Sequence, residues 1–391
     1  MSQIDVAIIG AGAAGAMSAA MLGRKGYAVA LIDPIHPFAP DFRCEKLEHD
    51  HIDALAKAGL LDEVLPAARP YARTWIARQG HLVEKRPMLE YGIEYSALVN
   101  TLRGLVPENV SFLSDKVVGL SSTSAGPVLQ LASGARLEAR LVIAASGLNN
   151  DLLTAMDMGR DVVSKCHSVS IGFDLMPEGK HAFDFGALTY FGEAPEHRVA
   201  YFTIFPIGDH MRANLFVYRE LSDPWFKAFR ADPVAAIHAS MPRLRQITGD
   251  FRIITAPRVR PVDLVDTHGA ARDGIVLIGD AYRTACPVSG TGASKAMIDA
   301  ERLCNTYVPR WLQLDAIKAG DIAEFYDDPK KRASDAHSRE VSLFAKKLAL
   351  EPGLAWTMYR WVRCTGAVSR NALNGIRRAF SSDKAGIQWQ S

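Results

Sequence analysis

The sequence is poor in cysteine and carries no excess of charge of either sign. Five cysteines among 391 residues are an odd number, and none of them forms a Cys-x-x-Cys pair. This argues against a disulfide framework or a zinc knuckle, so we expect no metal site and a reducing, cytoplasmic location. The formal net charge is only +2. The chain therefore has no general electrostatic field that would attract nucleic acid, and we expect no nucleic-acid partner.

Long hydrophobic runs are also scarce. Only residues 6–23 form an apolar stretch of about the length that a membrane span needs. The residues before this stretch carry no positive charge, and the stretch itself is rich in glycine and alanine, which disfavours a signal peptide. A buried strand, turn and helix explain it better, so we predict that the chain has no transmembrane segment.

The order of strand-like and helix-like patterns indicates an α/β fold. A strand over 5–9, a helix over 13–25 and a strand over 27–32 make a βαβ opening, typical of a Rossmann-type parallel sheet. Between about 164 and 254, alternating aromatic-rich runs favour an inserted antiparallel sheet. The pattern further predicts helices over 49–58, 95–105 and 291–304, a hairpin over 71–83, strands over 136–145 and 275–278, and mostly helix over 310–391. The predicted domains are a Rossmann-type domain of 1–70, 92–163 and 262–310, an antiparallel-sheet domain of 71–91 and 164–261, and a C-terminal helical region of 311–391.

A glycine-rich turn follows the first strand directly. It reads Gly10-Ala11-Gly12-Ala13-Ala14-Gly15, the G-x-G-x-x-G pattern in the strand–turn–helix context that dinucleotide binding requires. The glycines permit a tight turn, a close approach of the pyrophosphate and close packing of helix on strand, and the helix N-terminus attracts the phosphates. Asp33 ends the second strand, where a carboxylate can bind a ribose hydroxyl. A glycine turn without a ligand is the alternative, and these residues do not distinguish NAD from FAD.

A second motif lies far along the chain. Residues 274–281 read as a strand that ends in Gly279-Asp280-Ala281, and the segment Pro287-x-x-Gly290-Thr291-Gly292 follows. Over residues 4–60 and 270–305 the chain resembles the class A flavoprotein monooxygenases, the p-hydroxybenzoate-hydroxylase-like family. The resemblance implies that FAD is the cofactor, bound by residues from both ends of the sequence. Asp280 would then contact the ribityl chain, the helix after the Gly290–Gly292 turn would face the flavin ring, and Arg43 would lie close to FAD.

The chain departs from the family pattern after the strand over 136–145. Members of the family usually have Ala-Asp-Gly at this point and use NAD(P)H, whereas this chain has Ala145-Ser146-Gly147. Flavin-dependent halogenases often have Ser-Gly here, but their Trp-x-Trp-x-Ile-Pro signature is absent, and residues 201–207 are the nearest segment. Tyr95 is a second departure, because related enzymes often have arginine at the start of that helix.

The resemblance implies an oxidoreductase that hydroxylates an aromatic or other electron-rich small molecule with dioxygen. The reaction would pass through a flavin C4a-hydroperoxide, with NAD(P)H as reductant. The alternatives are a two-component oxygenase or halogenase served by a flavin reductase partner, a double-bond reductase, and a flavoprotein that binds or senses without turnover. No catalytic acid or base is assigned.

The inserted sheet supplies candidates for the substrate pocket. These are His167, Tyr190, Tyr201 and Phe205, together with Phe173, Phe183 and Phe185. Each of these side chains also has the simpler interpretation of filling the core. Cys286, next to Pro287, is either a packed thiol or a reactive group near the flavin.

Residues 342–379 mix basic with aromatic and apolar side chains. Packing on the rest of the chain or a homodimer interface explains this pattern, and contact with a membrane surface is the alternative.

Overall fold

The computed structural model describes residues 4–43, 45–123, 126–156 and 158–364, in two compact units. The first unit consists of residues 1–70, 90–168 and 260–343, and the second of residues 71–89, 169–259 and 344–391. Of the segment 342–379, residues 365–379 lie outside the described residues, as does Cys44. The functional roles given above to separate domains stay a prediction.

The first unit is built on a largely parallel sheet. β2 (Val29–Ile32), β1 (Ile4–Ile9) and β9 (Arg136–Ala144) run parallel, with β6 (Ser111–Leu113) beside β2 and β16 (Ile275–Leu277) beside β9. The remaining strands lying mainly in this unit are β3 (Lys46–Leu47), β7 (Val117–Thr123), β8 (Gly126–Leu131) and β15 (Arg258–Thr267). β7 and β8 form an antiparallel pair that continues onto the start of β9. The parallel strands are almost wholly buried, as expected of strands covered on both faces.

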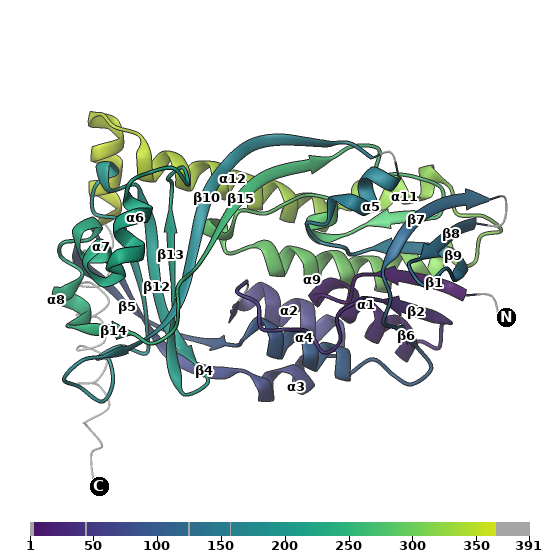
Figure 1. Ribbon diagram of the computed structural model, residues 1–391, viewed down its shortest axis with the longest axis horizontal. Helices are drawn as coiled ribbons and strands as arrows, with labels where there is room; N and C mark the ends of the chain where they lie inside the picture. The colour runs from purple at the N-terminus through teal and green to yellow at the C-terminus, as the bar shows by residue number, and fades with distance from the viewer. Residues whose placement is uncertain (1–3, 44, 124–125, 157, 365–391) are drawn as a thin grey trace, which may run out of the picture. The chain divides into compact units, whose positions relative to one another are not determined.

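Helices cover this sheet and form the main core with it. Figure 1 shows α1 (Ala13–Arg24), α2 (His49–Lys57), α4 (Tyr95–Gly104) and α9 (Gly292–Arg302), which contact one another in the first unit. Their buried apolar side chains belong to one cluster. Residues 13–23 of α1 are all buried, because small side chains let this helix lie between the sheet and its neighbours. The other helices of this unit are α3 (Leu61–Val64), α5 (Asn150–Ala155), α10 (Val308–Trp311), α11 (Ala319–Tyr326) and α12 (Pro329–Leu350), which extends into the second unit.

The second unit contains a mainly antiparallel sheet. Its strands follow the order β14–β10–β13–β12–β11–β4–β5. Their bounds are β4 (Arg69–Arg78), β5 (His81–Gly92), β10 (Arg160–Pro177), β11 (Ala187–Phe191), β12 (Val199–Ile207), β13 (His210–Val217) and β14 (Phe251–Ile253). Three helices accompany these strands, α6 (Trp225–Ala231), α7 (Pro233–Ser240) and α8 (Arg245–Thr248). Residues 354–364 form one more helix.

The predicted fold class is confirmed in both of its parts. The βαβ opening, the helices at 49 and 95, the hairpin that turns at Gln79-Gly80 and the strand at 275 all occur. Three features were not predicted. β11 pairs with β4 in parallel inside the antiparallel sheet, β7 and β8 form an antiparallel pair in the first unit, and residues 225–248 form three helices.

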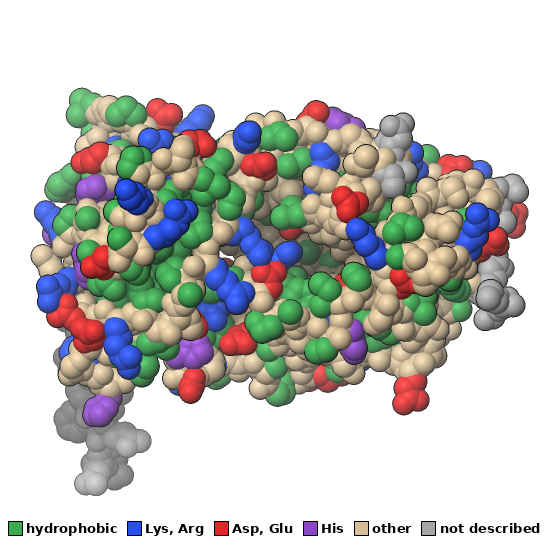
Figure 2. All heavy atoms as spheres, in the orientation of Figure 1, with side chains coloured by type: hydrophobic (Ala, Val, Ile, Leu, Met, Phe, Trp, Pro, Cys, Tyr) green, Lys and Arg blue, Asp and Glu red, His purple; other side chains and the backbone are tan. Residues whose placement is uncertain are grey.

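The surface agrees with the balanced composition. On the face shown in Figure 2, acidic and basic side chains are both scattered over the molecule. Within the described residues, no helix combines the length and the apolar character that crossing a bilayer requires.

Stability should fall in mild acid because His51 is buried in α2. Its Nδ1 accepts a hydrogen bond from the backbone N–H of Glu48 at 3.2 Å, and burial lowers the pKa of His51 to about 4. The unfolded chain takes up this proton near the ordinary pKa of 6.5, so the stabilisation is complete above that pH and is lost between 6.5 and about 4. The loss from this residue between pH 7 and pH 5 should be about 2 kcal/mol in the free energy of unfolding.

Urea unfolding of wild type and His51→Gln at the two pH values measures this effect. The variant should lose about 2 kcal/mol less than wild type, while His49→Gln, an exposed position on the same helix, should behave as wild type. Equal pH dependence of wild type and His51→Gln would contradict the assignment.

Candidate functional site

Three turns lie side by side at the edge of the parallel sheet that the carboxyl ends of its strands form. Ile9 of β1 and Leu277 of β16 are both level with Ala144 of β9 in the strand register. The turns that follow these strands therefore leave the sheet at the same edge, and the two outer turns are separated by the width of two strand spacings, about 10 Å. The two glycine motifs, more than 260 residues apart in sequence, thus meet on either side of Ala145-Ser146-Gly147.

The first turn depends on glycine for steric reasons. Gly10 has φ +93°, and a Cβ there would lie 2.6 Å from the carbonyl oxygen of Ala145. A Cβ on Gly15 would lie 1.8 Å from the carbonyl oxygen of Gly10, so helix and turn touch directly. Gly12 differs from both, because the nearest atom to its Cβ position is Tyr95 Oη at 3.6 Å. The space above Gly12 is therefore open, as the approach of a pyrophosphate to this backbone requires.

Tyr95 takes part in the same turn. Its hydroxyl accepts a hydrogen bond from the backbone N–H of Ala13 at 3.5 Å, and Gly12, the residue before α1, offers no side-chain cap. The tyrosine that replaces the arginine of related enzymes thus contacts the N-terminus of α1.

Asp33 lies beside the glycine turn. Its carboxylate accepts hydrogen bonds from the N–H groups of Ala11 at 2.7 Å and Ile35 at 2.9 Å. Arg103 of α4 forms an ion pair with Asp33 at 3.3 Å and donates to the carbonyl oxygen of Ala11 at 2.7 Å. Sequence reasoning missed Arg103. The available signal was a single arginine within an otherwise uncharged helical stretch, where a buried charge needs partners.

Arg160 joins the middle turn to the last one. This residue at the start of β10 donates to the carbonyl oxygens of Gly147 at 3.2 Å, Asp280 at 3.1 Å and Ala281 at 3.3 Å. No sequence pattern predicts these hydrogen bonds of Arg160, because they depend on how β10 passes the ends of the parallel strands. In the middle turn, the Ser146 hydroxyl is buried and has no hydrogen-bond partner among the described residues. Such an orphaned donor fits a site that a polar ligand completes.

Asp280 lies among three cationic side chains. Burial raises the pKa of this carboxyl, while Lys295, Arg43 and Arg160 and the backbone N–H of Ala285 act in the opposite direction. Arg43 is held by Asp41, whose carboxylate lies 2.6 Å from Arg43 Nε. The structure therefore brings Arg43 and Asp280 into one electrostatic environment.

The segment from Cys286 to Gly292 leads into α9. Gly290 has φ +69°, and Thr291 donates to the Ser338 hydroxyl of α12 at 2.7 Å. Cys286 is fully buried with its sulfur 3.2 Å from the Ser168 hydroxyl. This contact favours the interpretation of Cys286 as a packed thiol.

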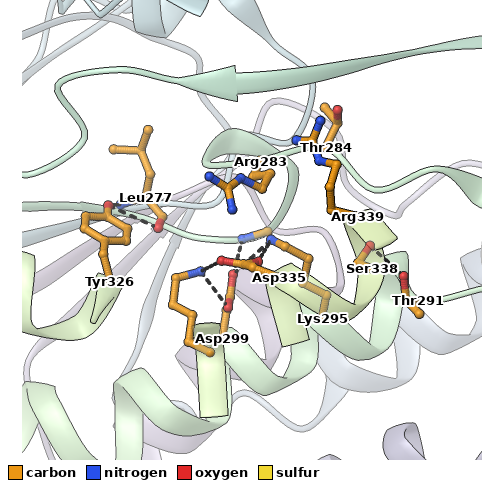
Figure 3. A network of polar contacts seen from close by, with 12 residues as sticks. Leu277, Arg283, Thr284, Thr291, Lys295, Asp299, Tyr326, Asp335, Ser338 and Arg339 are labelled. Atoms are coloured by element: carbon orange, nitrogen blue, oxygen red, sulfur yellow. Dashed lines mark hydrogen bonds and ion pairs between the residues drawn. The ribbon is translucent and has the colours of Figure 1, made fainter. Parts of the chain in front are cut away.

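A buried network of two lysines and two aspartates ties α9 and α12 to the Gly279 turn (Figure 3). Lys295 Nζ lies 3.1 Å from Asp335 and 3.6 Å from Asp299, and Lys331 Nζ lies 2.9 Å from Asp299 and 3.3 Å from Asp335. Asp299 also accepts a hydrogen bond from the N–H of Gly279 at 2.9 Å. All four side chains are at most 5% exposed. The network is neutral as a whole, and it fixes the turn that carries Asp280.

The electrostatics of the network follow from its geometry. Burial acts to lower the pKa of Lys295, but Asp299 and Asp335 outweigh it and raise the pKa to about 12. Burial acts to raise the pKa of Asp299, but the two lysines and the Gly279 N–H hold it below its usual range. Both groups are therefore charged at neutral pH.

The predicted pocket residues lie in different surroundings. In the second unit, Tyr190 and Phe205 are fully buried, and the Tyr190 hydroxyl donates to Glu193 at 2.5 Å. Tyr201 is half-buried against Phe216, with ring centroids 4.7 Å apart. His167 belongs to the first unit, where Nδ1 is 3.0 Å from the Ser164 hydroxyl. Their assignment to a substrate pocket stays a prediction.

Comparison with known proteins agrees with this geometry. A family model described as FAD binding domain matches residues 3–307. The chain belongs to this FAD-binding family. The predicted relationship to flavoprotein oxidoreductases of the class A type is thereby confirmed, and the cofactor that this domain binds is FAD.

Solved structures show the same fold at low sequence identity. The p-nitrophenol 4-monooxygenase PnpA from Pseudomonas putida DLL-E4 is 17% identical with a TM-score of 0.72, over 96% of this chain and 98% of that chain. PqsL from Pseudomonas aeruginosa, a probable FAD-dependent monooxygenase, is 19% identical with a TM-score of 0.66, over 88% and 97%. The flavin-dependent brominase Bmp2 is 17% identical with a TM-score of 0.69, over 97% and 100%. A search of curated protein sequences found no match.

The buried network predicts that a charge-balanced double variant is more stable than a single variant that leaves the network with a net charge. Asp335→Asn leaves two buried lysines with one carboxylate, which should lower the free energy of unfolding by about 3–5 kcal/mol. Lys331→Met with Asp335→Leu removes one charge of each sign and should recover at least half of that loss, because the remaining pair is again neutral. Urea unfolding of the three proteins measures the difference. A double variant less stable than Asp335→Asn would show that the side chains matter for packing and not for charge balance.

Proposed function

We propose that this protein is an FAD-dependent monooxygenase that hydroxylates an aromatic or other electron-rich small molecule, with NAD(P)H as reductant. The observation that carries the proposal is the meeting of the Gly10, Ser146 and Asp280 turns at one sheet edge. FAD bound there would pass electrons from the reductant to dioxygen, and dioxygen would supply the oxygen atom that enters the substrate. The chain's own residues would bind the cofactor, hold its charge and keep water from the reaction.

We assign the cofactor contacts by position along the sheet edge. Asp33 would accept from the adenosine ribose, since its carboxylate retains acceptor capacity beyond its two backbone partners. Gly10, Gly12 and Gly15 with Ala13 and Ala14 at the start of α1 would hold the pyrophosphate. Asp280, next to Gly279, would accept from the ribityl hydroxyls.

The flavin ring would lie toward the segment Pro287 to Gly292 and the N-terminus of α9. A reduced flavin carries negative charge, which a helix N-terminus stabilises by about 0.3–2 kcal/mol. Arg43 and Arg160, which also lie close to Asp280, add positive charge outside the neutral lysine–aspartate network. These charges favour the reduced, anionic state of a cofactor in this position.

The second unit would supply the substrate surface. Tyr190 and Phe205 fill its core, so they would act by shaping the sheet. Tyr201 on β12 is only half-buried and is therefore the better candidate for direct contact with an aromatic substrate.

Ser146 favours one alternative function. Its hydroxyl stands where the family has a carboxylate linked to NAD(P)H use, and it has no partner among the described side and main chains. A two-component oxygenase or halogenase, which receives reduced flavin from a partner reductase, needs no such carboxylate. No particular residue supports the other alternative function, a flavin-dependent double-bond reductase.

Gly12→Ala should separate cofactor binding from folding. The added methyl meets no protein atom closer than 3.6 Å but occupies the space proposed for the pyrophosphate. Thermal unfolding of the apoprotein should be nearly unchanged, while the Kd for FAD should rise at least about tenfold, a loss of about 1.4 kcal/mol. Gly104→Ala, where nothing lies within 4 Å of the added methyl, is the matched control and should bind FAD as wild type does. Wild-type affinity in Gly12→Ala would refute the assignment of this turn.

Anaerobic mixing with NADH or NADPH tests the reductant. Rapid bleaching of the flavin absorbance by either nucleotide, faster in the presence of a phenolic substrate, is the expected result. The contrary result has two parts: neither nucleotide bleaches the flavin although dithionite reduces it, and turnover appears only when a flavin reductase is added. The two-component alternative would then replace the proposal that NAD(P)H reduces the flavin directly.

A further inference from the structure

The helix over 354–364 has its apolar side turned outward. Leu354 is 76% exposed, Met358 58%, Trp361 60% and Val362 64%. These positions are spaced i, i+4, i+7 and i+8 and so share one helix face. A surface helix of a globular protein normally turns such a stripe toward the core.

The opposite side of this helix, which packs against the rest of the second unit, carries Arg360 and Cys364. Arg360 donates to the carbonyl oxygens of Leu348 and Glu351, each at 3.0 Å, and so closes the end of α12. Cys364, 8% exposed, packs against Ile76 and Val83. The helix is therefore anchored by Arg360 and Cys364, and the exposure of Leu354 and Met358 is a consequence of that anchoring.

Further aromatic side chains lie beside the exposed stripe of this helix. Phe344 of α12, 38% exposed, lies 5.8 Å from the ring of Tyr359 and 6.1 Å from that of Trp356. Tyrosine and tryptophan are the residues that proteins place at the boundary between lipid and water. We call the set Phe344, Leu354, Met358, Tyr359, Trp361 and Val362 the C-terminal apolar face.

Charge distinguishes this part of the chain from all the rest. Residues 344–391 contain eight Lys and Arg against two Asp and Glu, a net charge of +6, whereas residues 1–343 have a net charge of −4. Lys347 is exposed on α12, and the Arg363 guanidinium lies 6.0 Å from the centre of the Tyr359 ring. The C-terminal apolar face thus belongs to the strongly basic segment of the chain.

We propose that the C-terminal apolar face docks on the surface of an anionic phospholipid membrane. Apolar side chains entering the headgroup region and basic side chains attracting anionic headgroups are the two contributions that hold an interfacial helix. Within the described residues no helix is long and apolar enough to cross a bilayer, so we propose that the helix lies along the surface. A second copy of this chain is a poorer occupant, because a two-fold contact would bring two segments of net charge +6 together.

Co-sedimentation of the purified full-length holoprotein with vesicles tests the proposal. Wild type should sediment with vesicles that contain phosphatidylglycerol and phosphatidylcholine, and should remain in the supernatant with phosphatidylcholine alone. Raising the salt concentration should weaken the binding, because it screens the headgroup charge.

Two variants examine the two contributions. Leu354→Gln with Met358→Gln should lower the partition coefficient at least about tenfold, and Lys347→Glu at least about fivefold. Leu89→Gln with Leu221→Gln, two leucines of the second unit that are 59% and 48% exposed, is the matched control and should bind as wild type. Unchanged circular dichroism and FAD content would show that each variant is folded.

Three results would overturn the proposal. These are no sedimentation with anionic vesicles, equal binding to neutral and anionic vesicles, and equal binding of wild type and Leu354→Gln with Met358→Gln. A wild-type dimer in sedimentation velocity without lipid that becomes a monomer in this double variant would instead assign the face to self-association.

Discussion

The parallel register of β1, β9 and β16 is the constraint on which the site depends. Because Ile9, Ala144 and Leu277 end level with one another, three loops from distant parts of the sequence are forced to one edge. The close approach of these loops explains why glycine is needed in the first of them. Gly10 and Gly15 leave no room for a side chain, whereas Gly12 leaves room that the protein itself does not fill. A single sheet edge thus supplies both the close packing of the turn and an open position beside it.

Polar side chains then hold these loops in place. Arg103 connects the first loop to Asp33, Arg160 connects the second to the third, and the Lys295–Asp299–Lys331–Asp335 network connects the third to α12. Buried ion pairs lose much of their Coulomb energy to desolvation, so their main effect is to select one arrangement. A helix late in the sequence therefore takes part, through charge, in fixing the site that we propose for the cofactor, although none of its residues belongs to either glycine motif.

Much of this organisation could be predicted from local patterns. The βαβ opening, the glycine turn, Asp33 and the Gly279-Asp280 motif are short-range features, since each is encoded within a few residues. Arg160 and Lys331 could not be predicted, because their partners are set by how β10 and α12 meet the sheet edge. The parallel pairing of β11 with β4 could not be predicted either. The alternation of apolar and polar residues in a strand does not reveal whether the neighbouring strand is parallel or antiparallel. Tyr190 fills the core with Glu193 as its hydroxyl partner, which agrees with the simpler of the two interpretations of its ring, and its assignment to a substrate pocket stays a prediction.

The most direct test of the central claim is hydrogen–deuterium exchange of the apoprotein with and without one equivalent of FAD. We predict that FAD slows exchange in the backbone amides of all three segments together, residues 10–15, 145–147 and 279–292, because one cofactor covers all three loops. Slower exchange in residues 10–15 alone, with the other two segments unaffected, would contradict it.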